Sequence, residues 1–163
     1  MESLSYEECV AFVPKLDIAK CVKVYDGDTF HLGTILPEPY GATRFSCRLL
    51  GVDTPELRTR DDAEKALARE ARDIVKSLIL HKMVNVRVSG MDKYGRLLVR
   101  ITIPATETTP YCADLSQHLI NERVAIHYDG GRKPKVNWTE LLNSHTALKS
   151  TRRTQPTAER LSD

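Results

Sequence analysis

The chain has 163 residues, of which 41% are hydrophobic, and a formal net charge of +2 at pH 7. This composition indicates one globular domain with an extension or tail, long enough to form a core without disulfide or metal cross-links. No run approaches the roughly 18 apolar residues of a membrane span. The near-neutral charge neither supports nor excludes a nucleic-acid partner, because a local basic patch matters more than the sum.

The hydrophobic pattern then predicts the elements in chain order. It indicates a short helix over 5–14, strands over 19–25, 28–36 and 44–52, an amphipathic helix from Asp61 to about His81, strands over 83–89 and 96–103, and helices over 114–124 and 137–149. Five strands with a helix between the third and fourth is the order of an OB-fold barrel. We therefore expect an α+β chain, mainly a five-stranded OB-fold barrel with about three helices.

The ends of the chain and its cysteines give weaker predictions. We expect an N-terminal extension over 1–18, one domain over 19–149 and a disordered tail over 150–163, because the tail has almost no apolar residues. The beginning lacks the basic and then apolar pattern of a signal peptide, so an intracellular location is expected. No cysteine spacing suggests zinc, and all four are expected to be reduced and mostly buried: Cys9, Cys21, Cys47 and Cys112.

The stretch "VKVYDGDTFHL" places Asp26, Gly27 and Asp28 between two strand patterns. Asp-Gly between alternating apolar residues is a strong hairpin signal, because both residues tolerate a positive φ. Most such sequences are turns and nothing more. Whether Asp28 also serves a metal site depends on which other charged residues reach the same place.

Two further stretches carry charged residues at strand ends. The third strand ends in "RLLGVDTPE", where Arg48 has the opposite parity to Phe45, Cys47 and Leu49 and can point away from their face. "DKYGR" joins the fourth and fifth strands, with Gly95 at a left-handed position. Taken singly, each stretch is also compatible with a solvated strand edge or hairpin tip.

Together, the three stretches supply aspartates, a glutamate, a threonine and two arginines at strand ends, where a barrel holds functional groups on a rigid frame. Carboxylate and carbonyl oxygens suit hard cations such as Ca²⁺ or Mg²⁺. Arginines present a planar fork to phosphate oxygens, and a carboxylate near a metal-bound water can accept its proton. This combination is typical of phosphoryl transfer with a hard metal.

The ordered set "DGDT", "RLLGVDTPE" and "DKYGR" resembles the staphylococcal nuclease (thermonuclease) family, over about Ala19 to Tyr128. The resemblance implies a barrel of the OB-fold kind and calcium-dependent hydrolysis of DNA and RNA, by a chain that is a monomer. It also implies that Asp28, Asp53 and the backbone carbonyl of Thr54 bind the metal.

The same resemblance implies the catalytic and substrate-binding residues. Glu56 would lie by the attacking water, and Arg48 and Arg96 would contact the scissile phosphate. Three more residues match family positions near the substrate, but each is also compatible with an ordinary structural or surface role: Lys93, Tyr94 and Tyr128.

Two departures and two alternatives remain. The loop "LRTRDD" is shorter than in the secreted bacterial enzyme, and the C-terminal helical part is reduced, which leaves substrate preference and rate open. One alternative is a catalytically inactive OB-fold module that binds nucleic acid, although a pure binder does not need the complete set of acidic and basic residues. The other is a protein-interaction module that uses the barrel surface.

Overall fold

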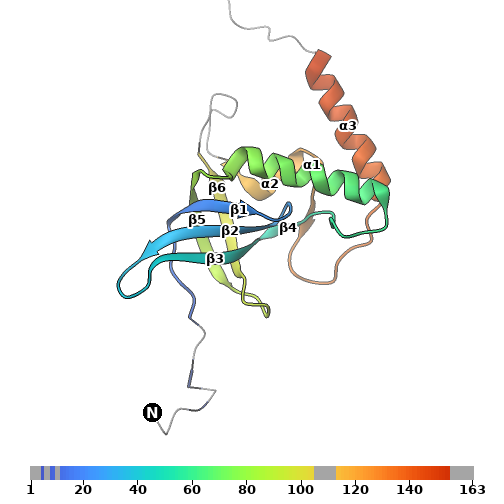
Figure 1. Cartoon of the computed structure of the whole chain (residues 1–163). Helices are drawn as coiled ribbons and strands as arrows, with labels where there is room; N and C mark the ends of the chain where they lie inside the picture. Colours follow the sequence, from blue (N-terminus) through green and yellow to red (C-terminus); the bar gives the residue numbers. More distant parts are fainter. Residues whose placement is uncertain (1–4, 6–7, 10–11, 105–112, 155–163) are drawn as a thin grey trace, which may run out of the picture.

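The computed structural model describes residues 5, 8–9, 12–104 and 113–154. In this part of the chain the strands are β1 (Ile18–Val24), β2 (Thr29–Leu36), β3 (Gly41–Leu49), β4 (Gly51–Asp53), β5 (Met83–Met91), β6 (Leu97–Ile103), β7 (Ala113–Asp114) and β8 (Ile126–Tyr128). The larger sheet has the order β3-β2-β1-β5-β6-β7. A parallel pairing of β3 with β6 closes the first five of these strands into a barrel, and β7 pairs only with β6 (Figure 1). β4 pairs separately with β8. The predicted OB-fold barrel and the α+β class are therefore confirmed.

The barrel strands alternate between core and surface, as the two-residue period of a strand requires. In β6 the residues at odd positions from Leu97 to Ile103 are buried, whereas Arg100 and Thr102 between them are exposed. In β3, Cys47 and Leu49 are buried and Arg48 lies on the other side of the strand, as its parity predicts. The interior of the barrel is therefore apolar, and polar side chains collect on its rim and outer face.

Three helices accompany the barrel in the described residues: α1 (Asp62–Ile79), α2 (Leu115–Asn121) and α3 (Trp138–Thr154). Asp61 caps α1 by accepting a hydrogen bond from the backbone N–H of Glu64 at 2.9 Å. α1 lies across one end of the barrel, and α3 packs against α1 and projects away from the barrel (Figure 1). None of the described helices is long and apolar enough to cross a membrane.

Two predicted elements differ in length. The strand expected over 44–52 is divided at Leu50, because Gly51, the first residue of β4, has φ +87° and turns the chain there. The helix expected over 114–124 ends at Asn121, and Arg123 adopts φ 59°, which an α-helix cannot continue through. The break at Gly51 redirects the chain toward β8, and this positions Asp53.

The N-terminal extension is described only in part. The helix expected over 5–14 falls partly on residues outside the described set, and the described residues of that range are not helical. Cys9, Cys21 and Cys47 are free thiols, of which Cys9 is exposed and the other two are buried. Cys112 lies outside the described residues.

α3 continues five residues into the segment expected to be disordered, because side chains attach it to the rest of the domain. Arg152 contacts both carboxylate oxygens of Glu122 at 2.7 Å. His145 is almost fully buried, and its Nδ1 donates to the carbonyl of Glu122 at 2.6 Å. Residues 155–163 of the expected tail lie outside the described residues.

Candidate active site

The residues predicted as a site come together at one edge of the barrel. A cavity of about 730 Å³ lies where the β1–β2 turn, the end of β3, the β5–β6 hairpin and the segment after β8 meet. We call it the strand-end cavity. Of the nine predicted residues, only Thr54 does not line it; the eight that do are Asp28, Arg48, Asp53, Glu56, Lys93, Tyr94, Arg96 and Tyr128.

The β1–β2 turn that presents Asp28 is held by Asp26 and Gly27. The carboxylate of Asp26 accepts hydrogen bonds from the N–H groups of Asp28 at 3.2 Å and of Thr29 at 2.7 Å. Gly27 does not have the positive φ that the hairpin signal suggested. Its role is instead steric, because a Cβ there would lie 2.8 Å from Cγ2 of Thr54.

Asp28 is buried and held in one orientation. Its Oδ2 accepts hydrogen bonds from the backbone N–H of Thr54 at 3.1 Å and from the Thr54 hydroxyl at 3.0 Å. Its Oδ1 accepts from the hydroxyl of Thr29 at 3.1 Å. Thr54 therefore positions the aspartate through its amide and side chain, which is additional to the carbonyl role that the resemblance implies.

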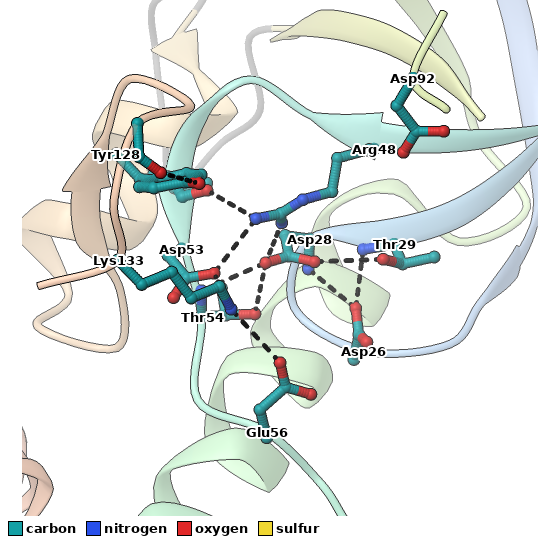
Figure 2. A network of polar contacts seen from close by, with 12 residues as sticks. Asp26, Asp28, Thr29, Arg48, Asp53, Thr54, Glu56, Asp92, Tyr128 and Lys133 are labelled. Atoms are coloured by element: carbon teal, nitrogen blue, oxygen red, sulfur yellow. Dashed lines mark hydrogen bonds and ion pairs between the residues drawn. The ribbon is translucent and has the colours of Figure 1, made fainter. Parts of the chain in front are cut away.

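Arg48 lies between the two buried aspartates (Figure 2). Its Nη1 contacts Oδ2 of Asp28, and its Nη2 lies 3.1 Å from Oδ1 of Asp53 and 3.2 Å from the carbonyl of Val52. A short charge-assisted network of this kind fixes the plane of the guanidinium. The end of β3 and the start of β4 thus place one cation and two carboxylates within contact of each other.

Lys133, from the segment after β8, reaches the same carboxylates. Its Nζ lies 2.9 Å from Oδ1 of Asp53 and 3.4 Å from Oε1 of Glu56 (Figure 2). Partial burial works against the charged amine, but the contacts with Asp53 and Glu56 outweigh it and raise the pKa of Lys133. The side chain of Glu56 is itself largely exposed, so the lysine connects an exposed carboxylate to a buried one.

Arg96 is held in place by Asp92, which lies in the same β5–β6 hairpin. Its Nε donates to Oδ2 of Asp92 at 2.7 Å, and its Nη1 lies 3.4 Å from the Thr29 hydroxyl. The guanidinium also lies 5.6 Å from the centre of the Tyr94 ring, and Nζ of Lys93 lies 5.1 Å from the same ring. Arg96 is thereby oriented by a hairpin that also carries Lys93 and Tyr94.

Asp92 also forms the hairpin itself. Its Oδ1 accepts from the N–H groups of Tyr94 at 2.9 Å and of Arg96 at 3.0 Å, and Gly95 has the predicted left-handed φ, +79°. Burial alone would raise the pKa of Asp92, but hydrogen bonds from Arg96 and Tyr94 outweigh it and lower the pKa. Asp92 therefore stays ionised as the counter-charge of Arg96.

Tyr128 lies on the far wall of the cavity, in β8. It pairs in register with Gly51, and its hydroxyl donates to the carbonyl of Gly131 at 2.7 Å. That hydrogen bond holds the ring of Tyr128 next to the segment that carries Lys133. The position fits a substrate contact as well as a purely structural one.

The donor chemistry of the cavity fits a hard divalent cation. Asp28, in the β1–β2 turn, and Asp53, in β4, are buried carboxylates that share Arg48 as a neighbour. Among the described residues, no three His, Cys, Asp or Glu side chains lie close enough to hold a metal by themselves. Two carboxylates supplemented by carbonyl, water or phosphate oxygens suit Ca²⁺, which accepts mixed oxygen shells.

Asp26 adds a third negative group beside this pair. Burial, and then the charge of neighbouring Asp28, raises the pKa of Asp26 to about 6. The guanidinium of Arg48, which contacts Asp28, compensates part of the negative charge of this turn.

Comparison with known proteins identifies the family. The model of the staphylococcal nuclease homologue family matches residues 46–154, more than half of the chain. The chain belongs to this family. The matched range includes the segments that carry Arg48, Asp53 and Arg96 and also α3, whereas the β1–β2 turn precedes it.

Curated proteins that match this staphylococcal nuclease homologue share less than 30% of the aligned residues with it. A probable endonuclease of Schizosaccharomyces pombe is 27% identical over 85 residues, which are 52% of this chain and 37% of that protein. Proteins named "Probable endonuclease lcl3" from Aspergillus flavus and Aspergillus oryzae are 28% identical over 108 residues, 64% of this chain and 39% of theirs. The chain thus spans less than two fifths of the length of these relatives.

Asp92 and Lys133 form ion pairs with predicted site residues in the cavity but were not themselves predicted from the sequence. Asp92 precedes "KYGR", and an aspartate that opens a hairpin was a usable signal for a group that orients Arg96. Lys133 lies in the basic loop after β8, about 80 residues from Asp53. No local sequence pattern connects that lysine to Asp53, so only the tertiary fold identifies it.

Proposed function

We propose that the chain is a metal-dependent nuclease that hydrolyses phosphodiester bonds of DNA, RNA or both. The observation that carries the proposal is the convergence of Asp28 and Asp53 on Arg48 in one cavity, with Arg96 and Glu56 on its walls. The family membership and the names of the curated relatives as probable endonucleases support the same reaction class.

The two arginines act on the phosphate in this proposal. Arg48 and Arg96 each offer a planar fork of N–H donors to phosphate oxygens, and these donors stabilise the extra charge of a five-coordinate transition state. Asp92 orients Arg96 before substrate arrives. Lys93, Tyr94 and Tyr128 contact neighbouring parts of the substrate from the cavity walls.

The acidic residues bind the metal and activate water. Asp28, Asp53 and the carbonyl of Thr54 would hold Ca²⁺, which supplies positive charge to a phosphate oxygen and to the attacking water. Glu56 orients that water or accepts its proton. Lys133 keeps Glu56 close to the cavity through the contact at 3.4 Å.

Ca²⁺ should support cleavage better than Mg²⁺. Mg²⁺ requires a near-octahedral shell at about 2.0–2.1 Å and loses water reluctantly, whereas Ca²⁺ tolerates six to eight oxygens at about 2.3–2.6 Å. A small misplacement of water and phosphate between rigid strand ends can reduce the rate strongly. We therefore expect Mg²⁺ to bind and to compete with Ca²⁺. Equal or faster cleavage with Mg²⁺ alone would contradict this assignment.

The test is the initial rate of cleavage of single-stranded DNA, duplex DNA and RNA with Ca²⁺, Mg²⁺ or a chelator. We expect cleavage with Ca²⁺, none with the chelator, and strongly reduced rates for Asp28→Asn and Asp53→Asn. Binding of nucleic acid without cleavage under all conditions would identify an inactive binding module instead. Equal cleavage with chelator and with Ca²⁺ would disprove the role of the metal.

A further inference from the structure

The outer face of β6 leads out of the strand-end cavity. Leu98 lines this cavity, whereas Arg100 and Thr102, the next two outward residues of the strand, line a second groove of about 720 Å³. A Cβ on Gly51, which lines the cavity, would lie only 3.6 Å from Nη1 of Arg100. The guanidinium of Arg100 therefore lies at the boundary, and one strand connects the two depressions.

Arg100 faces a second arginine across the sheet. Arg87 in β5 is its partner in the antiparallel register, and both side chains are exposed. Side chains directly opposite each other have Cβ atoms about 4.5–5.5 Å apart, and like charges in such a pair are destabilising. The free protein thus keeps two repelling cations at adjacent positions, which an anion bound between them would stabilise.

The arginine pair is only weakly neutralised. Nη1 of Arg100 lies 4.0 Å from Oδ2 of Asp114, and Arg87 makes no ion pair with any residue of the described set. The carboxylate of Asp114 is also engaged as the cap of α2, where it accepts from Gln117 at 3.0 Å. The remaining charged residues of the groove are Lys15 and Asp17.

The spacing along β6 relates this groove to the proposed reaction. Arg96 and Arg100 are four residues apart, about 13 Å along a strand at about 3.3 Å per residue. OB-fold proteins that bind single strands cover about 4–16 nucleotides per domain. A strand whose scissile phosphate lies at Arg96 therefore extends beyond the cavity, and the outer face of β6 is a path along which it meets further cations.

We propose that Arg87 and Arg100, assisted by Lys15, form a second phosphate-binding position for the nucleic-acid strand cleaved in the strand-end cavity. This inference rests on the proposed function. We call the residues Lys15, Asp17, Arg87, Arg100 and Asp114 the β5–β6 groove. The position binds backbone phosphate without reading bases, and it increases affinity for longer substrates.

The test is binding of fluorescent single-stranded oligonucleotides of about 3 and about 12 nucleotides to wild type, Arg87→Gln, Arg100→Gln and the double variant, over a range of salt. Each lost phosphate contact should lower the slope of log K against log salt by about one, so the double variant should lose about two. The loss of affinity should be severalfold at low salt and should grow with oligonucleotide length. Arg44→Gln, an exposed strand arginine lining a different face, is the matched control and should behave as wild type.

The outcomes separate this inference from the proposed function. An unchanged salt slope in the double variant, with cleavage intact in wild type, would overturn the phosphate position alone. Binding that depends on both arginines, with no cleavage under any metal, would overturn the proposed function alone. An equal loss in Arg44→Gln would show a general effect of net charge and would also overturn the inference.

Discussion

The strand-end cavity and the β5–β6 groove use arginine in opposite ways. In the cavity Arg48, Arg96 and Lys133 each have a carboxylate oxygen within 3.1 Å. In the groove the contact of Arg100 with Asp114 is 4.0 Å long, and its cross-strand neighbour is another arginine. The first arrangement fixes a guanidinium in one orientation, as a reaction at one phosphate requires. The second leaves cations exposed to attract a strand without specifying its position.

The largest expected effect comes from removing the fork of Arg48. Arg48→Lys keeps the charge but cannot contact two phosphate oxygens and two aspartates in one plane. Loss of such a transition-state donor should reduce turnover by about 10²–10³. Steady-state rates on single-stranded DNA with Ca²⁺ would measure it, with thermal unfolding as the check that the variant folds. Wild-type turnover in folded Arg48→Lys would remove this arginine from the mechanism.

Glu56→Gln should have the next largest effect. The change is nearly isosteric, and Asp28 and Asp53 remain for the metal, so binding of Ca²⁺ and of oligonucleotide should persist. Turnover should fall about 10²-fold if the carboxylate accepts a proton from water, because an amide cannot. Rates and oligonucleotide affinity should be measured on the same preparation. Intact turnover together with intact affinity would assign Glu56 a structural role.

Asp92→Asn tests whether Arg96 depends on its orientation. The amide oxygen can still accept the hairpin N–H bonds of Tyr94 and Arg96, but the charge-assisted bond to Nε of Arg96, 2.7 Å long, is lost. A charge-assisted bond is about twice as strong as a neutral one, so we expect turnover to fall about tenfold, with little change in melting temperature. The effects on kcat and on KM should be measured separately. Loss of the orientation of Arg96 should lower kcat, whereas a destabilised hairpin would change both kcat and KM.

Much of the barrel and of the strand-end cavity was predictable from the sequence. Asp28, Arg48, Asp53 and Arg96 lie in short stretches at strand ends, and the alternation in β3 predicts that Arg48 leaves the apolar face. The barrel order follows from five strand patterns with one helix between them. These features depend on local periodicity and turn residues, which a single sequence records.

The remaining features depend on contacts between distant segments. Gly27 is required because Thr54 packs against the turn, although the sequence suggested a positive φ. Lys133 reaches Asp53 only because β8 pairs with β4. α3 extends to Thr154 because Arg152 contacts Glu122, which no hydropathy pattern indicates. The opposition of Arg87 and Arg100 likewise appears only once the register of β5 and β6 is known.

The two regions should also differ in how their cations affect the stability of the fold, and the effect expected for the groove is the smallest of all. Replacing a cation in the cavity should destabilise the metal-free protein, because Arg48→Gln would leave the nearly buried Asp28 and Asp53 with less compensation, at a cost of about 3 kcal/mol. Replacing a cation in the groove should have the opposite sign. Arg87→Gln removes a like-charge neighbour of Arg100 and no ion pair formed with the described residues.

We therefore expect Arg87→Gln to raise the free energy of unfolding by about 0.2–1 kcal/mol at low ionic strength. The gain should disappear in about 1 M salt, where the Debye length is about 3 Å and exposed charges are screened. Urea unfolding at both salt concentrations would measure it, with Arg44→Gln as the control, because Arg44 is paired with Gly33 and not with a cation. Destabilisation of Arg87→Gln at low salt would mean that Arg87 has a stabilising partner, and the two regions would then differ in degree and not in kind.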